Sequence, residues 1–178
     1  MKTSFTVAAW IFAALLVLAV PTSASRRLLQ GDCPPTQAQV SASIDQWNQD
    51  VLEVNNFLNV AATLADPTGA AANTEQVALN EPVQLGILGN VVGLSTDAQN
   101  AVTLLMEVFG NVPTDLQSIV TNPSASNVQT QLNSINNVRC LNVLPALDIL
   151  WPAAAVAVGL DVANVPAVAR PNACATIS

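Results

Sequence analysis

The side chains that could carry out chemistry in this 178-residue chain are almost all carboxylates and thiols. The chain has no His and no Tyr, and its one Lys is Lys2. Without imidazole, His-based catalytic triads and His metal sites are excluded. Without a Lys beyond the second residue, a Schiff-base lysine and a phosphate-loop lysine are excluded as well. Twelve Asp and Glu residues and three Cys residues remain as candidate catalytic groups.

The carboxylates do not follow the pattern of an enzyme or of a metal site. Catalysis by paired carboxylates needs two acids that converge in a cleft, whereas Asp45/Glu53 and Asp97/Glu107 have the spacing of solvated helix faces. An Asp-x-Asp-x-Asp calcium loop is absent from the sequence. Asp148 could be a buried acid, but bonds to backbone N–H groups at a proline-broken first helical turn explain it better. We therefore expect no enzyme activity, no metal and no cofactor.

The three cysteines, Cys33, Cys140 and Cys174, fit no zinc pattern and no Cys-x-x-Cys redox motif. They allow one disulfide in three pairings. If four helices alternate up and down, the two ends of the chain meet and Cys33 pairs with Cys174, which leaves Cys140 as a buried thiol. If the chain folds back at Pro123, Cys140–Cys174 is the better pair. We favour the first arrangement.

The first 25 residues have the layout of a secretory signal peptide. Lys2 precedes an apolar run over residues 5–20, and small residues follow at 22–24. This run is shorter than the roughly 20 residues that a membrane span needs. Arg26-Arg27 is either a second trimming site or a solvated charge pair. We predict a secreted protein, extracellular or associated with a cell wall, that has no integral membrane anchor after cleavage.

The remaining charge is strongly negative. Beyond Arg27 the only cations are Arg139 and Arg170, and two cations against twelve carboxylates give a net charge of −10. Binding nucleic acid through its phosphates requires Lys and Arg, so this class of partner is excluded. Docking on an anionic membrane leaflet is disfavoured for the same reason.

The stretch 36–65 has the clearest structural pattern in the chain. Its apolar residues are separated by alternating intervals of four and three, which is the spacing of a helix packed lengthwise against other helices. Thirty residues would form a rod of roughly 45 Å, which needs partners of similar length. The positions in this seam are Val40, Ile44, Trp47, Val51, Val54, Leu58, Ala61 and Ala65.

Further helices follow from the same kind of pattern. The intervals of four and three recur within 81–109, which predicts one continuous helix, with a kink near 93–95 as the alternative. Residues 70–80 are expected to be weakly helical or a loop. Two more apolar faces, over 114–121 and 126–138, predict helices that are either collinear or folded back on each other.

The stretch 140–162 is the most apolar part of the chain beyond the leader, and it has no polar face. Such a helix is central in a bundle or faces a lumen. Prolines recur after residue 164, which predicts an extended tail over 164–178. We predict an all-α domain over 28–163, an antiparallel bundle of four to five helices that follows a cleaved signal peptide.

The leader and the two heptad stretches, Val40–Ala65 and Ile87–Val108, resemble the hydrophobic-surface-binding and cell-wall galactomannoprotein group of filamentous fungi. Members of this group are secreted helical bundles, some of which bind fatty acids within the bundle. The resemblance implies an apolar ligand or an apolar surface as the binding partner. It fixes no site residue and no oligomeric state.

Two functions from different classes follow. The first is a non-enzymatic carrier of a lipid or another apolar small molecule such as a fatty acid, held in a lumen of several hundred Å³. Arg139, which adjoins the apolar stretch, would then bind the headgroup carboxylate, unless it pairs with one of the acids. The second is a cell-wall or effector-type protein that has a packed core and acts by protein–protein interaction. The residues expected around a ligand tail are Leu94, Leu105, Leu147, Leu150, Trp151 and Val158.

Overall fold

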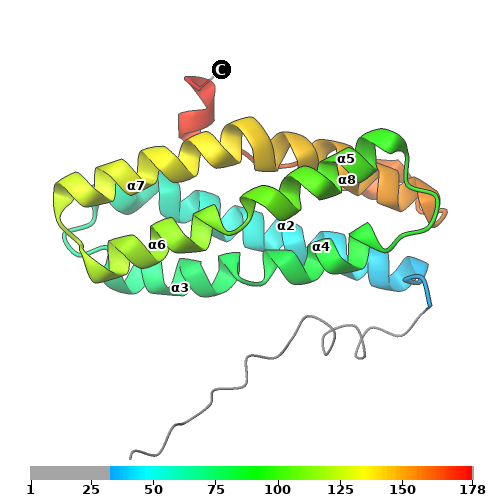
Figure 1. The fold of residues 1–178 in the computed structure, drawn as a ribbon, viewed down its shortest axis with the longest axis horizontal. Coiled ribbons are helices and arrows are strands. Elements are labelled where there is room, and N and C mark those ends of the chain that lie inside the picture. Colours follow the sequence, from blue (N-terminus) through cyan, green and yellow to red (C-terminus); the bar gives the residue numbers. More distant parts are fainter. Residues whose placement is uncertain (1–32, 178) are drawn as a thin grey trace, which may run out of the picture. The chain divides into compact units, whose positions relative to one another are not determined.

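The computed structural model describes residues 33–177, and the signal peptide and trimming predictions lie outside this range. Within it the chain forms seven α-helices and no strand. The helices are arranged as four antiparallel rods, each of which packs lengthwise against its neighbours (Figure 1). The prediction of an all-α antiparallel bundle is confirmed.

The first rod is helix α2 (Gln37–Val60), which carries the heptad seam as far as Leu58. The helix predicted over 36–65 is too long, because Ala61 lies in the following 3₁₀ turn and Ala65 is exposed beyond it. Thr36 caps its N-terminus: the Thr36 hydroxyl accepts from the Gln39 backbone N–H at 3.3 Å, and the Thr36 N–H donates to the Gln39 side chain at 2.8 Å. This reciprocal capping satisfies two backbone donors that the first helical turn leaves free. A 3₁₀ turn (Ala61–Thr63) ends the rod before Pro67.

The second rod consists of α3 (Thr68–Ala78) and α4 (Glu81–Gly89), so most of residues 70–80 is helical and only Leu79 and Asn80 form a turn. The prediction of one continuous helix over 81–109 is wrong. Gly93 has a φ of +90°, a left-handed conformation that breaks a helix, and the Ser95 hydroxyl caps the next helix by accepting from the Ala98 N–H at 3.3 Å. The heptad spacing continues through this turn because the helices on both sides bury residues in the same core.

The third rod consists of α5 (Thr96–Val108) and α6 (Asn111–Thr121), and the fourth runs from α7 (Ala125–Val138) to α8 (Leu144–Ala157). The chain folds back between α6 and α7, which settles the question that the sequence left open. A π-helical turn, η2 (Arg139–Val143), joins α7 to α8 directly before Pro145. Proline lacks the N–H that an α-helix needs at this position, and π-turns are a common local adjustment to such a gap. By length and composition the rod 125–157 could cross a membrane, a property that core helices of soluble bundles share.

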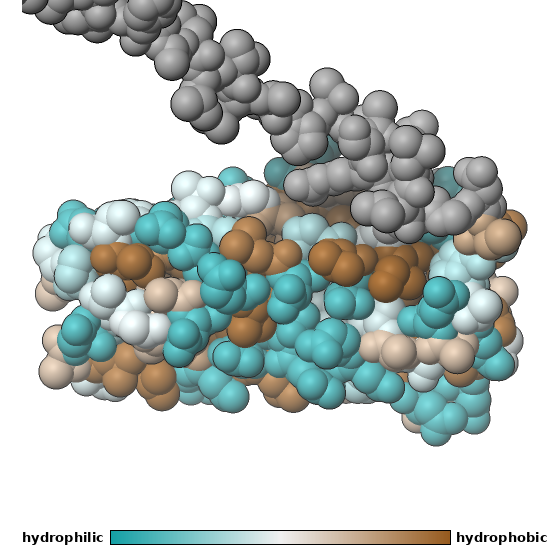
Figure 2. Space-filling view, turned by 90° about the horizontal axis from the view of Figure 1, so that it is seen from below, coloured by the Kyte–Doolittle hydropathy of each residue, from teal (hydrophilic) through white to brown (hydrophobic). Residues whose placement is uncertain are grey.

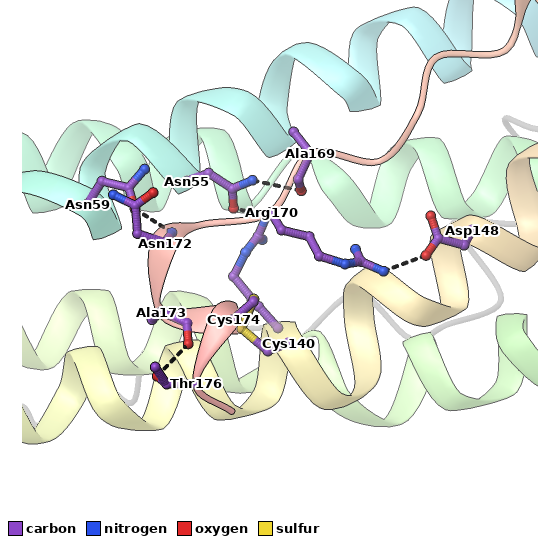
Figure 3. The surroundings of a disulfide bond; sticks show 11 residues. Asn55, Asn59, Cys140, Asp148, Ala169, Arg170, Asn172, Ala173, Cys174 and Thr176 are labelled. Atoms are coloured by element: carbon purple, nitrogen blue, oxygen red, sulfur yellow. Dashed lines mark hydrogen bonds and ion pairs between the residues drawn. A yellow bond between two sulfur atoms is a disulfide. The ribbon is translucent and has the colours of Figure 1, made fainter. Parts of the chain in front are cut away.

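The C-terminal residues return along α2 and contain only the 3₁₀ turns η3 (Val162–Asn164) and η4 (Asn172–Ala175). A disulfide joins Cys174 in η4 to Cys140 in η2, with their Cα atoms 5.3 Å apart (Figure 3). The favoured pairing of Cys33 with Cys174 is therefore wrong, and Cys33 is exposed and free. The fold-back between α6 and α7 is the reason, because it brings the fourth rod beside the returning tail.

The core of the bundle is divided into two apolar clusters by a layer of buried polar side chains. One cluster fills the space among the first half of α2, α4, α5 and α8, and the other among the second half of α2, α3, α6 and α7. In the first, second and fourth rods, buried polar residues lie where the rod passes from one cluster to the other. The polar residues at these crossings are Asp50, Asn55, Glu81, Asn136 and Arg139.

Candidate functional site

The residues expected to surround a ligand tail fill the space between the rods themselves. Leu105, Leu147, Leu150 and Trp151 are 0 % exposed and belong to the first apolar cluster. A side chain that lined a cavity large enough for water would expose area to that cavity, so no such void adjoins these four. Leu94 is buried in the same cluster. Val158, the last of the predicted tail contacts, is partly buried and packs against the edge of this cluster.

Arg139, the predicted headgroup partner, is inside the protein and has no exposed surface. It lies at the start of the π-turn and its side chain points across the bundle. Its Nη1 donates to Glu81 Oε1 at 3.1 Å and its Nη2 donates to Asn55 Oδ1 at 3.3 Å. The alternative that the sequence left open, an ion pair with an acid, is what the structure contains, although the pair is buried and not on the surface. Arg139 therefore holds α2, α4 and the fourth rod together.

Asp50 is the second acid of this polar layer. Gln46 donates to its Oδ1 at 2.9 Å, while its Oδ2 is buried and has no hydrogen-bond partner within the described chain. Burial is the main cause that raises the pKa of Asp50 above its ordinary value of 3.8; the Gln46 bond lowers this pKa, and the nearby charges of Glu81 and Glu53 raise it further. The side chains of this polar layer are all buried, so the layer lies inside the bundle.

The C-terminal tail completes this network from outside (Figure 3). Asn55, which accepts from Arg139, also donates through Nδ2 to the Ala169 carbonyl at 2.9 Å. Arg170 forms an ion pair with Asp148 on α8, and both side chains are partly exposed. The interpretation of Asp148 as a carboxylate bonded to backbone N–H groups is therefore wrong, since this acid holds the tail. Both cations in residues 33–177 are thus engaged with acids.

A groove of about 260 Å³ lies between α5 and the fourth rod and is called here the α5–α8 groove. It is an open depression with mostly apolar walls. Each wall of the groove is one face of a helix. The wall residues on α5 are three or four positions apart, and those on the opposite wall, across η2 and α8, recur every four positions. The lining residues are Asp97, Asn100, Ala101, Leu104, Leu141, Asn142, Pro145, Ala146 and Ile149.

Two large apolar side chains of this groove are exposed. Leu141 is 50 % exposed and Ile149 is 44 % exposed, and Pro145 lies between them along the same face. Other exposed apolar residues occur elsewhere, and on the visible part of the face in Figure 2 they form small areas separated by polar ones. In the α5–α8 groove, the exposed apolar side chains line a concave surface.

The groove also contains three polar side chains at its edges: Asp97, Asn100 and Asn142. None of them makes a side-chain hydrogen bond to another residue of the range 33–177. Their carboxylate and amide groups are therefore available to a bound molecule. The sequence pattern does not predict this site, because a stretch without a polar face gives no reason to place Leu141 and Ile149 outside the core. Their four-residue spacing around Pro145 was the available signal.

The described part of the chain holds no group of three or more His, Cys, Asp or Glu side chains that is suited to a metal ion. No family model, no curated protein and no solved structure matches the chain.

Proposed function

We propose that this is a secreted, non-enzymatic binding protein that holds an apolar or amphiphilic small molecule in the α5–α8 groove. The observation that carries the proposal is the groove itself, a concave apolar surface on a bundle whose interior is filled at the expected ligand positions. Ligand sites in proteins are typically concave and mostly apolar, with a few polar groups that fix orientation. The Cys140–Cys174 disulfide is compatible with an extracellular location.

The size of the groove sets the kind of ligand. At about 260 Å³ it lies just below the range of 300–1,000 Å³ typical of drug-sized ligands. Because the groove is open, it would cover one side of an alkyl chain or a small ring system and leave the other side in water. Burial contributes about 25 cal/mol for each Å² of apolar surface removed from water, so a chain covered on one side is expected to bind more weakly than one enclosed in a lumen.

The test measures displacement of the neutral fluorescent probe N-phenyl-1-naphthylamine by 1-dodecanol, both below their solubility limits. The wild-type protein should bind saturably, and Ile149→Asn should weaken binding by about tenfold because a wall of the groove becomes polar. Leu52→Asn is the matched control, since Leu52 is 42 % exposed on α2 and lies outside the groove lining. Affinity equal in the two variants would place the ligand elsewhere.

A second candidate is an interaction protein, and the packed interior favours it. In that case the same groove would receive an apolar side chain from a partner protein, with complementarity provided by Leu104, Leu141 and Ile149. If the wild type binds none of the alkyl probes saturably, the small-molecule proposal fails and the interaction protein is favoured.

A further inference from the structure

The chemistry at the edges of the α5–α8 groove indicates what headgroup its ligand carries. The polar lining residues are one carboxylate, Asp97, and two amides, Asn100 and Asn142. No cation lines the groove. A fatty acid would bring its own carboxylate beside Asp97, and two like charges in one site repel each other.

Within the described residues, no unpaired cation is available to neutralise the Asp97 carboxylate. Arg139 is buried against Glu81, and Arg170 is paired with Asp148. If the side chain of either arginine turned towards the groove, its ion pair would be lost. In the case of Arg139 it would also leave the Glu81 carboxylate buried without a partner, which is strongly unfavourable. The groove therefore keeps its negative character.

We infer that the α5–α8 groove selects amphiphiles with a protonated amine headgroup, such as long-chain alkylammonium ions, over carboxylates of the same chain length. This inference rests on the proposed binding function of the groove. The alkyl chain lies against Leu104, Leu141 and Ile149. The ammonium group donates to the Asp97 carboxylate and to the side-chain oxygen of Asn100, one helical turn along α5, while Asn142 lies nearer Leu104 at the other end of the groove.

Asp97 lies in the first turn of α5, where a carboxylate also interacts favourably with the helix N-terminus. The Ser95 hydroxyl already accepts from the Ala98 N–H, so the cap does not depend on Asp97. The carboxylate makes no side-chain hydrogen bond within residues 33–177, and its side chain lines the groove. Asp97 can interact with the helix N-terminus and bind a ligand headgroup at the same time. Only headgroup binding predicts that ligand selectivity changes when Asp97 is replaced.

The experiment compares dodecylammonium, 1-dodecanol and dodecanoate in the same displacement assay, at one ionic strength and below their critical micelle concentrations. Wild-type protein should bind dodecylammonium about tenfold more tightly than dodecanoate, with dodecanol between them, since each exposed charge contact changes affinity by up to about fivefold. Asp97→Asn should reduce this ratio by about threefold or more. Glu107→Gln removes the same charge from the same helix outside the groove, and it should leave the ratio within about twofold.

The outcomes separate the two proposals. If dodecanol binds but dodecylammonium binds no more tightly than dodecanoate, the headgroup inference is overturned and the binding function stands. If the amine is preferred equally in Asp97→Asn and Glu107→Gln, the preference comes from the overall negative charge, and the role of Asp97 is overturned. If none of the three amphiphiles binds, the binding function itself fails.

Discussion

Arg139 and Glu81 are 58 residues apart in the chain, yet the Arg139 Nη1 lies 3.1 Å from the Glu81 Oε1 in the middle of the bundle. Their side chains are 0 % and 2 % exposed. Together with Asn55 they connect three of the four rods between two apolar clusters. Only one alignment of the rods along their length lets these three side chains meet, so we infer that the pair fixes the register of the bundle.

This arrangement predicts a large cost for removing one partner of the buried pair. Arg139→Met leaves the Glu81 carboxylate buried and uncompensated, and should lower the free energy of unfolding by about 3–5 kcal/mol. The double variant Arg139→Met/Glu81→Met removes both charges and should regain most of this loss. Arg170→Met, the same change in the exposed pair with Asp148, should cost less than about 1 kcal/mol. Urea denaturation of the four proteins checks this, and equal losses at the two arginines would contradict it.

Asp50 should make stability depend on pH in the direction opposite to a salt-bridged acid. Because burial raises its pKa in the folded protein above 3.8, the folded state holds a proton that the unfolded state releases. Stability from this group is therefore fully present below pH 3.8 and falls as pH rises from there through the folded pKa. Asp50→Asn removes the buried charge and keeps the acceptor for Gln46, so it should raise the free energy of unfolding at pH 7 by about 1 kcal/mol.

The comparison of wild type and Asp50→Asn should be made by thermal unfolding at several pH values. The advantage of the variant should shrink as pH falls towards 3.8. Asp45→Asn, an exposed change on the same helix, provides the control and should have little effect on stability. A variant that is destabilised most at neutral pH would show that the Asp50 carboxylate is stabilised in the folded state, contrary to the effect of its burial.

The disulfide should stabilise the bundle through the returning tail. Cys140 and Cys174 are 34 positions apart, and closing a loop of this size stabilises by up to about 4 kcal/mol in the chain-entropy model. Cys140→Ser/Cys174→Ser should lower the midpoint of urea unfolding accordingly, whereas Cys33→Ser should leave it unchanged because Cys33 is exposed and unpaired. Peptide mapping without reduction gives an independent check. A Cys33-linked peptide would contradict the pairing.

Local sequence patterns predicted much of the fold. The heptad seam on α2, with Val40, Ile44 and Trp47 buried, followed from interval counting because a long amphipathic helix has a regular period. The heptad spacing continues through Gly93 and favoured one continuous helix, so the break there was predicted only as the alternative. The disulfide depended on whether α6 and α7 fold back, and spacing alone does not determine the direction of a loop.

The candidate site was predicted less well than the fold. An Arg in a charge-poor stretch suggested a headgroup partner, but Arg139 is buried against Glu81, a residue that sequence reasoning did not connect with it. Long-range pairing of this kind depends on the rotation of each rod about its axis. The same rotation decides that Ile149 faces a groove while Leu150, one position further, is in the core. In a stretch without a polar face, the sequence does not indicate which apolar side chains face the core and which face solvent.

The most direct test of the account is a two-dimensional NMR titration of ¹³C-methyl-labelled and ¹⁵N-labelled protein with 1-dodecanol. We predict saturable shifts of the methyl signals of Leu104, Leu141 and Ile149, whose side chains line the α5–α8 groove. The Leu147 and Leu150 methyl signals and the Trp151 indole signal, from side chains that are fully buried in the core, should change little. Shifts centred on Leu147, Leu150 and Trp151, with Leu141 and Ile149 unaffected, would show that the ligand opens the bundle and enters its interior, and would contradict the account.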